Sequence, residues 1–443
     1  MAGRGGLSAP QATAAAFAGP VRHVYVHVPF CMARCDYCDF DAEAVGVAVP
    51  PPARGAAAPV AAAGGVAAAA PGRVAASPVA ALFDAYAGAV AAEWERERAA
   101  HGVRRVETLY FGGGTPALLG AERLERLVAT FAPWLTPRAE VTVETNPDEA
   151  DDAFAAWAGG RGVRVSLGVQ SFLPELRAAL GRRPSADPAA AARRLRAAGV
   201  RDLSVDLMHG IPGQTAAKLA ADLAAVDDLS PDHVSWYELG IVRGTPLARR
   251  LRDDGRAGGV ADAGGSDPVA GRAAGASLRA ALPGEDARAA LYREVVRGLQ
   301  GRGYRWYEVS SFARPGRRAR HNVAYWRARP YLGLGPGAVS TVGSLRWRNA
   351  AGSASSVEEL GAGRPPRRRA EALDGETLAR ERLLLAARCG LAVPCSEIAL
   401  AVDADAAVPL VTAGLLSLHS GTIRVTRKGR YVANEVCVRL FRA

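Results

Sequence analysis

Hydrophobic and polar positions along the first half of the chain follow two alternating periods. Short runs rich in β-branched residues are followed by longer stretches in which apolar residues return at helical spacing. The predicted helices lie at 78–101 and 121–135, and the predicted strands lie at 21–28, 106–113, 139–147, 163–172, 202–210 and 233–240. About six such repeats predict an α/β fold, a partial (β/α)6 TIM-type barrel with parallel strands and helical crossovers.

Polar and glycine-rich motifs stand where the predicted strands end. They read CxxxCxxC, GGGTP, ETNPD, GVQSF and DLMHGIPGQT in chain order. In barrels of parallel strands the working residues lie at the carboxyl ends of the strands. The pattern therefore predicts an active site at that end of the barrel.

The pattern also predicts the domain organisation. We expect a disordered tail at 1–20, a barrel at 21–250 with a low-complexity insertion at 43–77, and a low-complexity linker at 251–286. Residues 287–350, with an aromatic strand at 304–312, are expected to cap the barrel. Residues 351–443 are expected to form an α+β region with a winged-helix-like end, in which Lys428 and Gly429 make a turn. This last domain is expected to cover the barrel mouth.

Composition changes this picture little. Of 443 residues 49% are apolar, and the formal charge is +11, almost all of it arginine. Arginine, alanine and glycine dominate the loops as well, so the charge is a weak sign of an anionic partner. Nucleic-acid binding stays a rival hypothesis because Arg424, Arg427, Lys428 and Arg430 lie on the predicted wing. No run is apolar enough for a membrane span or a secretory signal, so we expect a cytoplasmic protein, or one of an organelle matrix.

Three of the six cysteines, Cys31, Cys35 and Cys38, stand within eight positions. Six cysteines in so long a chain do not make a disulfide scaffold, and a thiol cluster implies a reducing compartment. Three thiolates can ligate three irons of a [4Fe–4S] cube and leave the fourth iron open. Such an iron can chelate S-adenosylmethionine, whose reductive cleavage produces a 5′-deoxyadenosyl radical. There are two alternatives. One is a zinc site whose fourth ligand is Asp36, Asp39 or His27, and the other is a catalytic cysteine.

The motifs YVHVPFCMARCDYCDF, FGGGTP, SLGVQSF, DLMHGIPGQT and HNVAYW occur in this order. With them the sequence resembles radical S-adenosylmethionine proteins of the oxygen-independent coproporphyrinogen III oxidase-like family, in its HemW-type haem chaperone branch. The resemblance spans about 21–349 and continues from 374 to the end. It implies a [4Fe–4S] cluster, S-adenosylmethionine and haem as cofactors.

The resemblance also implies roles for single residues. Cys31, Cys35 and Cys38 match the cluster ligands. The positions that match contacts to S-adenosylmethionine are Tyr25, Tyr37, Gly112, Gly113, Gly114, Glu144, Gln170, Arg182 and Asp206. Read alone, the glycines would be a tight turn and the two acids would be helix caps. The family usually has a histidine shortly after the matched arginine, where this chain has Pro184.

Two functional hypotheses are compatible with the cluster and S-adenosylmethionine motifs. One is an oxidase that decarboxylates coproporphyrinogen III, and the other is a chaperone that transfers haem to an acceptor protein. The oxidases resemble CxxxCxxCxC, and the last cysteine position is Phe40 here. The oxidases also carry a long N-terminal segment, whereas about twenty residues precede the first strand here. HNVAYW resembles the chaperone branch and contains His321, a candidate axial ligand of haem iron, with Tyr325 and Trp326 beside it.

The predicted function is therefore haem binding and delivery to a haemoprotein acceptor such as a respiratory enzyme. Coproporphyrinogen III oxidation is the alternative, and a nucleic-acid-modifying radical protein is a third possibility. A binding module that keeps the cluster without turnover is a further one. His321 could equally be a capping or core histidine, and the aromatic pair could belong to the core. We expect a monomer or dimer with at most peripheral membrane contact.

Overall fold

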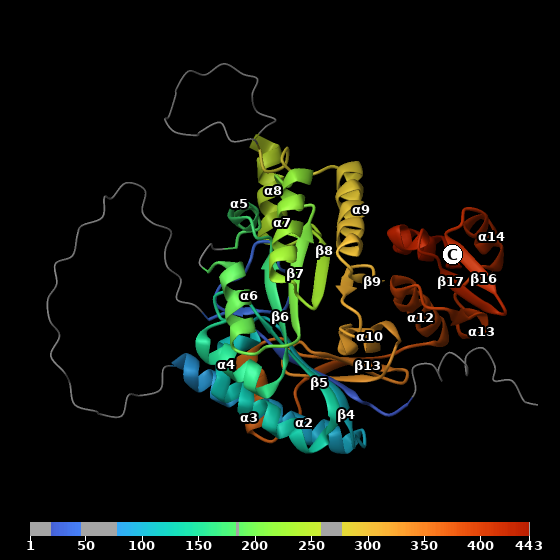
Figure 1. Cartoon of the computed structure of the whole chain (residues 1–443). Helices are drawn as coiled ribbons and strands as arrows, with labels where there is room; N and C mark the ends of the chain where they lie inside the picture. The colour runs from blue at the N-terminus through green and yellow to red at the C-terminus, as the bar shows by residue number, and fades with distance from the viewer. Residues whose placement is uncertain (1–18, 46–77, 183–185, 258–276, 443) are drawn as a thin grey trace, which may run out of the picture.

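The computed structural model describes residues 19–45, 78–182, 186–257 and 277–442 (Figure 1). The predicted tail at 1–18, most of the first insertion, Pro184 and much of the predicted linker lie outside these ranges. No helix in the described ranges has the length and apolar character needed to cross a bilayer.

Six parallel strands form the centre of the molecule. Their spatial order follows their chain order, and each pairs with the next in parallel register. They are β1 (His23–Val28), β4 (Val106–Gly113), β5 (Leu135–Thr145), β6 (Arg164–Gln170), β7 (Leu203–His209) and β8 (His233–Glu238). The sheet is open at both edges, so the predicted α/β fold with a partial barrel is confirmed.

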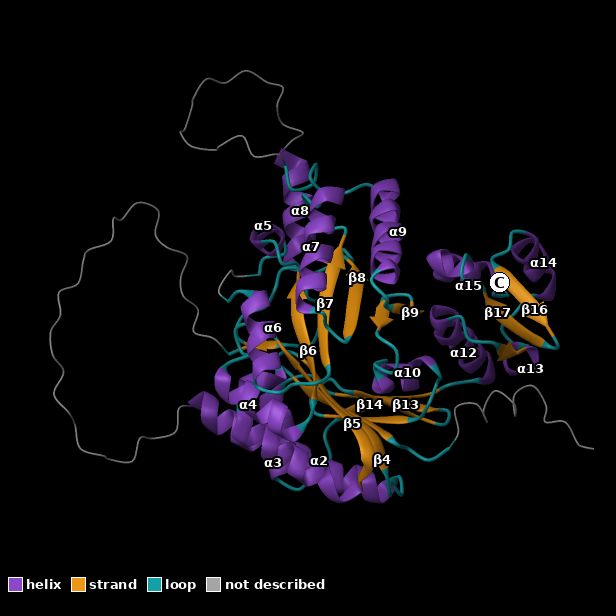
Figure 2. Ribbon diagram, in the orientation of Figure 1, coloured by secondary structure: helices purple, strands orange, loops and turns teal. Residues whose placement is uncertain are grey.

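Helices connect the successive strands and lie along the sheet (Figure 2). They are α2 (Pro78–Ala100), α3 (Ala121–Phe131), α4 (Asp152–Arg161), α5 (Pro174–Ala179), α6 (Pro188–Ala197), α7 (Ala216–Leu229), α8 (Pro246–Ala257) and α9 (Glu285–Gly301). Several begin at a side-chain cap. Asp151, Asp187 and Thr215 accept hydrogen bonds from the first backbone amides of α4, α6 and α7.

The two faces of the central strands differ in chemistry. Val165, Leu167 and Val169 alternate along β6 and are fully buried in the core beneath the helices, as are Leu203, Val205 and Leu207 on β7. The residues between them point to the other face because successive side chains of a strand point to opposite sides. That face carries the polar residues of the site described below.

The segment predicted to cap the barrel instead extends the sheet at both edges. Next to β8 lie β10 (Ser311–Ala313) and β9 (Arg305–Glu308), an antiparallel pair where the sequence predicted one strand. At the other edge β11 (Tyr331–Leu334) pairs in parallel with β1 and is followed by β12 (Val339–Val342), β13 (Leu345–Asn349) and β14 (Arg368–Ala372). The result is one sheet of 12 strands.

Between these two edges runs α10 (Arg320–Trp326), the helix of the HNVAYW motif. A further helix, α11 (Ser353–Gly361), packs against α2. Its first residue is held by Glu43, which accepts hydrogen bonds from the backbone amide and the hydroxyl of Ser353 at 2.6 Å each.

The C-terminal domain has a hydrophobic core of its own. It contains α12 (Gly375–Cys389), β15 (Val393–Pro394), α13 (Cys395–Ile398), α14 (Ala404–Thr412), β16 (Leu416–His419), β17 (Thr422–Val425) and α15 (Ala433–Leu440). Two strands and not one precede the last helix, and their turn lies at Ser420 and Gly421. After β17, Arg427 and Lys428 form a second turn, and Gly429 begins a 3-10 helix before α15, so the chain does turn at the predicted position.

Two predicted domain boundaries also need correction. The insertion was expected to begin at Glu43, but Glu43 and Ala44 form β3 (Glu43–Ala44) beside β2 (Phe30–Cys31). The linker was expected to begin at residue 251, yet α8 continues to Ala257. An amphipathic helix end is hard to see in a segment rich in glycine, because its composition resembles that of a loop.

Candidate functional site

A cavity of about 440 Å³ opens at the carboxyl ends of the central strands. The cysteine loop forms one side of it, and the ends of β4 to β8 form the floor and the other side. Its lining includes Cys31, Cys35, Cys38, Tyr37, Gly113, Gly114, Glu144, Gln170, Arg182 and Asp206. Ten of the thirteen residues predicted for the site are thus brought together.

Alternate residues of the strands line the cavity. Thr142 and Glu144 come from β5, Ser166, Gly168 and Gln170 from β6, and further polar side chains, Ser204, Asp206, His233 and Ser235, from β7 and β8. The strand register places Glu144 beside Ser166 and Asp206 beside both Gly168 and Ser235. The polar face of the sheet is therefore continuous from β5 to β8.

Backbone hydrogen bonds hold the cysteine loop over this face. The amides of Gly114 and Thr115, at the end of β4, donate to the carbonyls of Val28 and Phe30 at 2.7 Å. Farther along the loop, the amide of Asp36 donates to Leu180, and the carbonyl of Asp36 accepts from Leu247. The loop is thereby anchored to both sides of the cavity.

The three thiols are partly buried in the same cavity. Burial raises the pKa of Cys31 to about 11 and also raises the pKa values of Cys35 and Cys38. The Thr115 hydroxyl lies 3.8 Å from the Cys31 sulfur. Isolated thiols in this setting are protonated, so they need a metal partner to become thiolates.

A single metal ion does not fit the thiols as they stand. Within the described part of the chain, no three histidine, cysteine, aspartate or glutamate side chains are grouped to hold one ion. Zinc needs its ligands about one point. A cubane cluster spreads them, since each thiolate binds a different iron.

The three glycines act through close packing. A side chain at Gly114 would overlap the backbone of Phe30, and one at Gly113, whose φ is +111°, would meet the His27 ring. A Cβ at Gly112 would lie 3.0 Å from the Glu144 carboxyl, although Gly112 is not part of the lining. The missing side chains thus let β4 approach β1 and the cysteine loop.

Glu144 is partly buried at the centre of the polar face. It accepts hydrogen bonds from the Tyr110 hydroxyl at 2.6 Å and from the Gly113 amide at 3.1 Å. Burial, together with the neighbouring Asp206 carboxyl, raises the pKa of Glu144 to about 7. Glu144 lies in β5 and Asp206 lies in β7, so neither acid caps a helix. The Asp206 carboxylate accepts a hydrogen bond from the Ser166 hydroxyl at 2.9 Å. A cationic ligand would stabilise the ionised form of Glu144.

Arg182 and Gln170 lie at the end of β6. Arg182 donates to the Gly168 carbonyl at 2.5 Å and to the side chain of Asn146. Gln170 has a φ of +67°, in the left-handed region that residues other than glycine rarely adopt. Such strain persists where the surrounding structure enforces it, often at ligand sites.

Three predicted residues lie away from the cavity lining. Gly112 is one. Tyr25 lines a neighbouring cavity together with Phe40, and its ring stacks on Tyr110 with 6.0 Å between centroids. His321 is 1% exposed, its Nδ1 lies 2.8 Å from the Thr108 hydroxyl, and its ring contacts those of Tyr110 and Tyr325. The structure therefore places His321 in the core, with its buried Nε2 lacking a hydrogen-bond partner among the described residues.

The sequence interpretation missed several lining residues. Thr142, Asn146, Arg164 and Ser166 lie on the polar face, and Asn322 reaches the cavity from α10. The signal was available, because polar residues at every second position of an otherwise apolar strand mark a face that does not join the core. No residue after Asn322 contributes to the lining in the described ranges, so the C-terminal domain, which was expected to cover the mouth, takes no part in the lining.

Comparison with known proteins extends this description. A parallel sheet with a three-cysteine loop at its carboxyl edge defines a radical S-adenosylmethionine protein, and the model of the Radical SAM superfamily matches residues 25–225. The haem chaperone HemW of Mycobacterium tuberculosis strain H37Rv is 33% identical over 417 residues, 93% of each chain. HemW of Escherichia coli K12 is 30% identical over 324 residues, 72% of this chain and 70% of the relative. The chain belongs to the HemW haem chaperone family.

A solved structure agrees in fold. Coproporphyrinogen III oxidase (HemN) from Escherichia coli superposes with a TM-score of 0.70 at 22% identity, covering 97% of this chain and 92% of that one. At this identity the likeness concerns the fold alone. It includes the C-terminal domain as well as the barrel.

Proposed function

We propose that this protein binds haem and delivers it to a haemoprotein acceptor. The observation that carries the proposal is the 33% identity to proteins named haem chaperone, which extends over 93% of the chain and is not confined to the barrel. Phe40 supports it. This side chain is 60% exposed at the edge of the cavity, where the resemblance expects a cysteine in an oxidase.

We further propose that Cys31, Cys35 and Cys38 hold a [4Fe–4S] cluster and that S-adenosylmethionine binds beside it. The polar face fits such a ligand, because the buried Thr142 hydroxyl lines the cavity without a hydrogen-bond partner among the described residues. Glu144 offers a carboxylate for a cationic amine or for ribose hydroxyls, and Arg182 offers a guanidinium for a carboxylate. When bound, the cluster supplies the electron for cleavage of the sulfonium.

The nucleic-acid hypothesis finds little support in the position of the wing. The Arg427 guanidinium donates to the Gln300 side chain at 2.5 Å, and the Arg430 guanidinium lies 3.8 Å from the centroid of the Trp306 ring. Arg427 thus contacts α9 and Arg430 contacts β9, so both have contacts within the molecule, although Arg424 and Arg427 remain exposed.

The test combines two assays on the full-length protein after anaerobic reconstitution. We expect haemin to bind with a defined Soret band, and we expect no decarboxylation of coproporphyrinogen III in the presence of S-adenosylmethionine and a reductant. Robust decarboxylation would assign the oxidase activity instead. Absence of haem binding would refute the chaperone function.

The cluster ligands are tested by iron and sulfide analysis. The reconstituted protein should contain about four irons and four sulfides per chain, the content of one cubane. Cys35→Ala should abolish this, whereas Cys395→Ala, a change in the C-terminal domain, should retain it. A full cluster in Cys35→Ala would contradict the assignment.

A further inference from the structure

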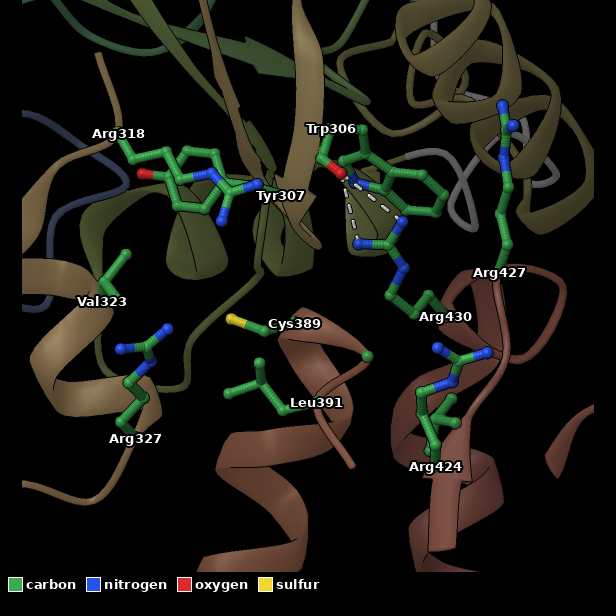
Figure 3. A pocket seen from close by; sticks show the side chains of 12 residues that line it. Trp306, Tyr307, Arg318, Val323, Arg327, Cys389, Leu391, Arg424, Arg427 and Arg430 are labelled. Carbon is green, nitrogen blue, oxygen red and sulfur yellow. Dashed lines mark hydrogen bonds between the residues drawn. The ribbon is translucent and has the colours of Figure 1, made fainter. Parts of the chain in front are cut away.

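A second cavity, of about 280 Å³, lies between the sheet extension and the C-terminal domain. Trp306 and Tyr307 of β9 and Val323 of α10 form one wall, and residues at the end of α12 and in β17 form the other (Figure 3). It shares no lining residue with the cysteine cavity, and the sequence interpretation connected only its wing arginines with a function, the binding of nucleic acid.

Five arginines line this cavity. Arg318 and Arg327 approach from the side of α10, while Arg424, Arg427 and Arg430 approach from the C-terminal domain (Figure 3). Among the described residues no aspartate or glutamate lines it. Guanidinium groups of one sign so close together repel one another unless an anion lies between them.

The internal contacts leave much of this charge unused. Arg430 is held by the Trp306 ring and carbonyl, and Arg427 by Gln300. Arg327 and Arg424 are exposed, and within the described ranges neither has an ion pair or a side-chain hydrogen bond. These two arginines stand on opposite walls, so an anion with two separate charged groups can contact both.

The cavity continues into a larger one. A neighbouring cavity of about 550 Å³ has Arg318, Val323 and Arg327 in its own lining. Because the two cavities share these three residues, we treat them as one region along α10, which we call the arginine groove; its far part also contains Glu107, which is paired with Arg22. Its combined size falls in the range of sites for drug-sized and cofactor ligands. Val323 and Leu391 give it an apolar surface, whereas the rings of Trp306 and Tyr307 are buried behind the arginines.

We propose that the arginine groove binds haem through its two propionate carboxylates, with Arg327 and Arg424 as the principal contacts. This inference rests on the proposed chaperone function and locates its cargo. Haem combines a flat apolar ring with two carboxylates, the pair of features that the groove matches. Guanidinium groups bind carboxylates through strong charge-assisted hydrogen bonds.

The position of α10 gives the HNVAYW motif a different role from the expected one. His321 points into the core, but Val323, in the middle of the motif, and Arg327, directly after it, line the groove. Cys389 supplies a sulfur on the groove wall. Burial raises the pKa of Cys389 to about 12, so its thiol is protonated at neutral pH, and we assign the binding to the arginines.

The experiment is a haemin titration of the full-length protein, followed by Soret absorption. Arg327→Gln combined with Arg424→Gln should weaken haemin binding at least about tenfold. The matched control, Arg297→Gln combined with Arg439→Gln, removes two exposed arginines elsewhere and should bind as the wild type does. Arg→Lys at positions 327 and 424 should restore part of the affinity, because it returns the charge without the bidentate geometry.

A second ligand, haemin dimethyl ester, in which both propionate carboxylates are neutral methyl esters, completes a double cycle of protein and ligand changes. The wild type should bind the ester as weakly as the Gln variant binds haemin, and the Gln variant should not discriminate between the two ligands. Equal haemin affinity of wild type and Gln variant would overturn the groove assignment while leaving the chaperone function intact. No haemin binding by the wild type would overturn both. Loss of binding to an RNA oligonucleotide in the Gln variant, with haemin binding unchanged, would make the groove a nucleic-acid site and overturn the proposal.

Discussion

Among single residues, Glu144 has the environment most sensitive to ligand charge. It lies partly buried between Tyr110 and Gly113, with a pKa raised to about 7. Its two hydrogen-bond donors, a hydroxyl and a backbone amide, are neutral, so they do not fully offset the negative charge of the ionised carboxylate. A bound sulfonium or ammonium group would do so. This makes the protonation state of one carboxyl part of the ligand-binding equilibrium.

The affinity for S-adenosylmethionine should therefore depend on pH through Glu144. Below about pH 7 the carboxyl is protonated, and binding of the cation must release that proton, so affinity should fall by up to about tenfold per pH unit. Above about pH 7 this dependence should level off. Equilibrium binding measured by calorimetry from about pH 6 to about pH 8 tests this.

Glu144→Gln should bind more weakly at high pH and should lose most of the pH dependence between about pH 6 and about pH 7. Glu122→Gln, an exposed change on α3, should behave like the wild type. If Glu144→Gln kept the full pH dependence, another group, such as the ligand's own amine, would be responsible.

Among the elements, the junction of β4 with the cysteine loop depends most on a single backbone position. The amide of Gly114 donates to Val28, and a side chain at Gly114 would overlap the carbonyl of Phe30. The strand therefore cannot keep its place and accept even a methyl group. A side chain at this position would therefore both lower the stability of the protein and displace the cysteine loop.

Gly114→Ala should lower the free energy of unfolding by about 1–3 kcal/mol and reduce cluster incorporation, because the loop must move away from β4. The matched control is Gly160→Ala near the end of α4, where nothing lies within 4 Å of the added methyl group. That change should be neutral or stabilise by up to about 1 kcal/mol. Thermal unfolding and iron content measure both effects. Equal stability of the two variants would show that the junction tolerates the added atom.

Local periodicity predicted the central elements well. The strand predicted at 106–113 is β4 within the same limits, and the helix predicted at 78–101 is α2 apart from its last residue. The sheet extension could not be found in this way. β11 joins β1 across some 300 positions of sequence, and that pairing depends on long-range packing that no local pattern contains. The run at 304–312 likewise hides the bend between β9 and β10, since aromatic residues stand on both sides of it, Trp306 and Tyr307 before it and Phe312 after it.

The site residues divide in the same way, into those that a local motif predicts and those that depend on packing. The cysteine motif and the strand-end acids were predicted because motif order carries them. Thr142, Arg164 and Ser166 were missed because they lie inside strands. For His321 the sequence left a haem ligand and a core histidine open, because a motif gives no side-chain direction; packing against Tyr110 and Tyr325 turns it inward.

For the whole molecule, the attachment of the C-terminal domain is the feature with the largest energetic consequence. α12 ends beside the sheet extension, where Arg388 pairs with Glu308 at 2.6 Å. Glu308 is 1% exposed and also accepts hydrogen bonds from Ser310 and Ser311. The two domains therefore share a buried carboxylate whose charge is balanced across the interface.

Arg388→Ala should destabilise the protein by about 2–4 kcal/mol, because Glu308 would remain buried without its cation. Adding Glu308→Gln should recover part of the loss, since the neutral amide still accepts the serine hydrogen bonds. Arg439→Ala, which breaks an exposed pair with Glu435, should change stability by less than about 0.5 kcal/mol. Urea unfolding followed by tryptophan fluorescence measures all three. If Arg388→Ala were as stable as Arg439→Ala, the pair would not hold the interface.

The seven-residue helix α10 is a wall common to the cysteine cavity and the arginine groove. Asn322 faces the first, and Val323 and Arg327 face the second. If a ligand on either side displaces the helix, the affinity on the other side changes, and thermodynamic linkage makes the two factors equal. A protein of this design can release its cargo in response to the occupancy of its cofactor site, with no radical reaction taking place.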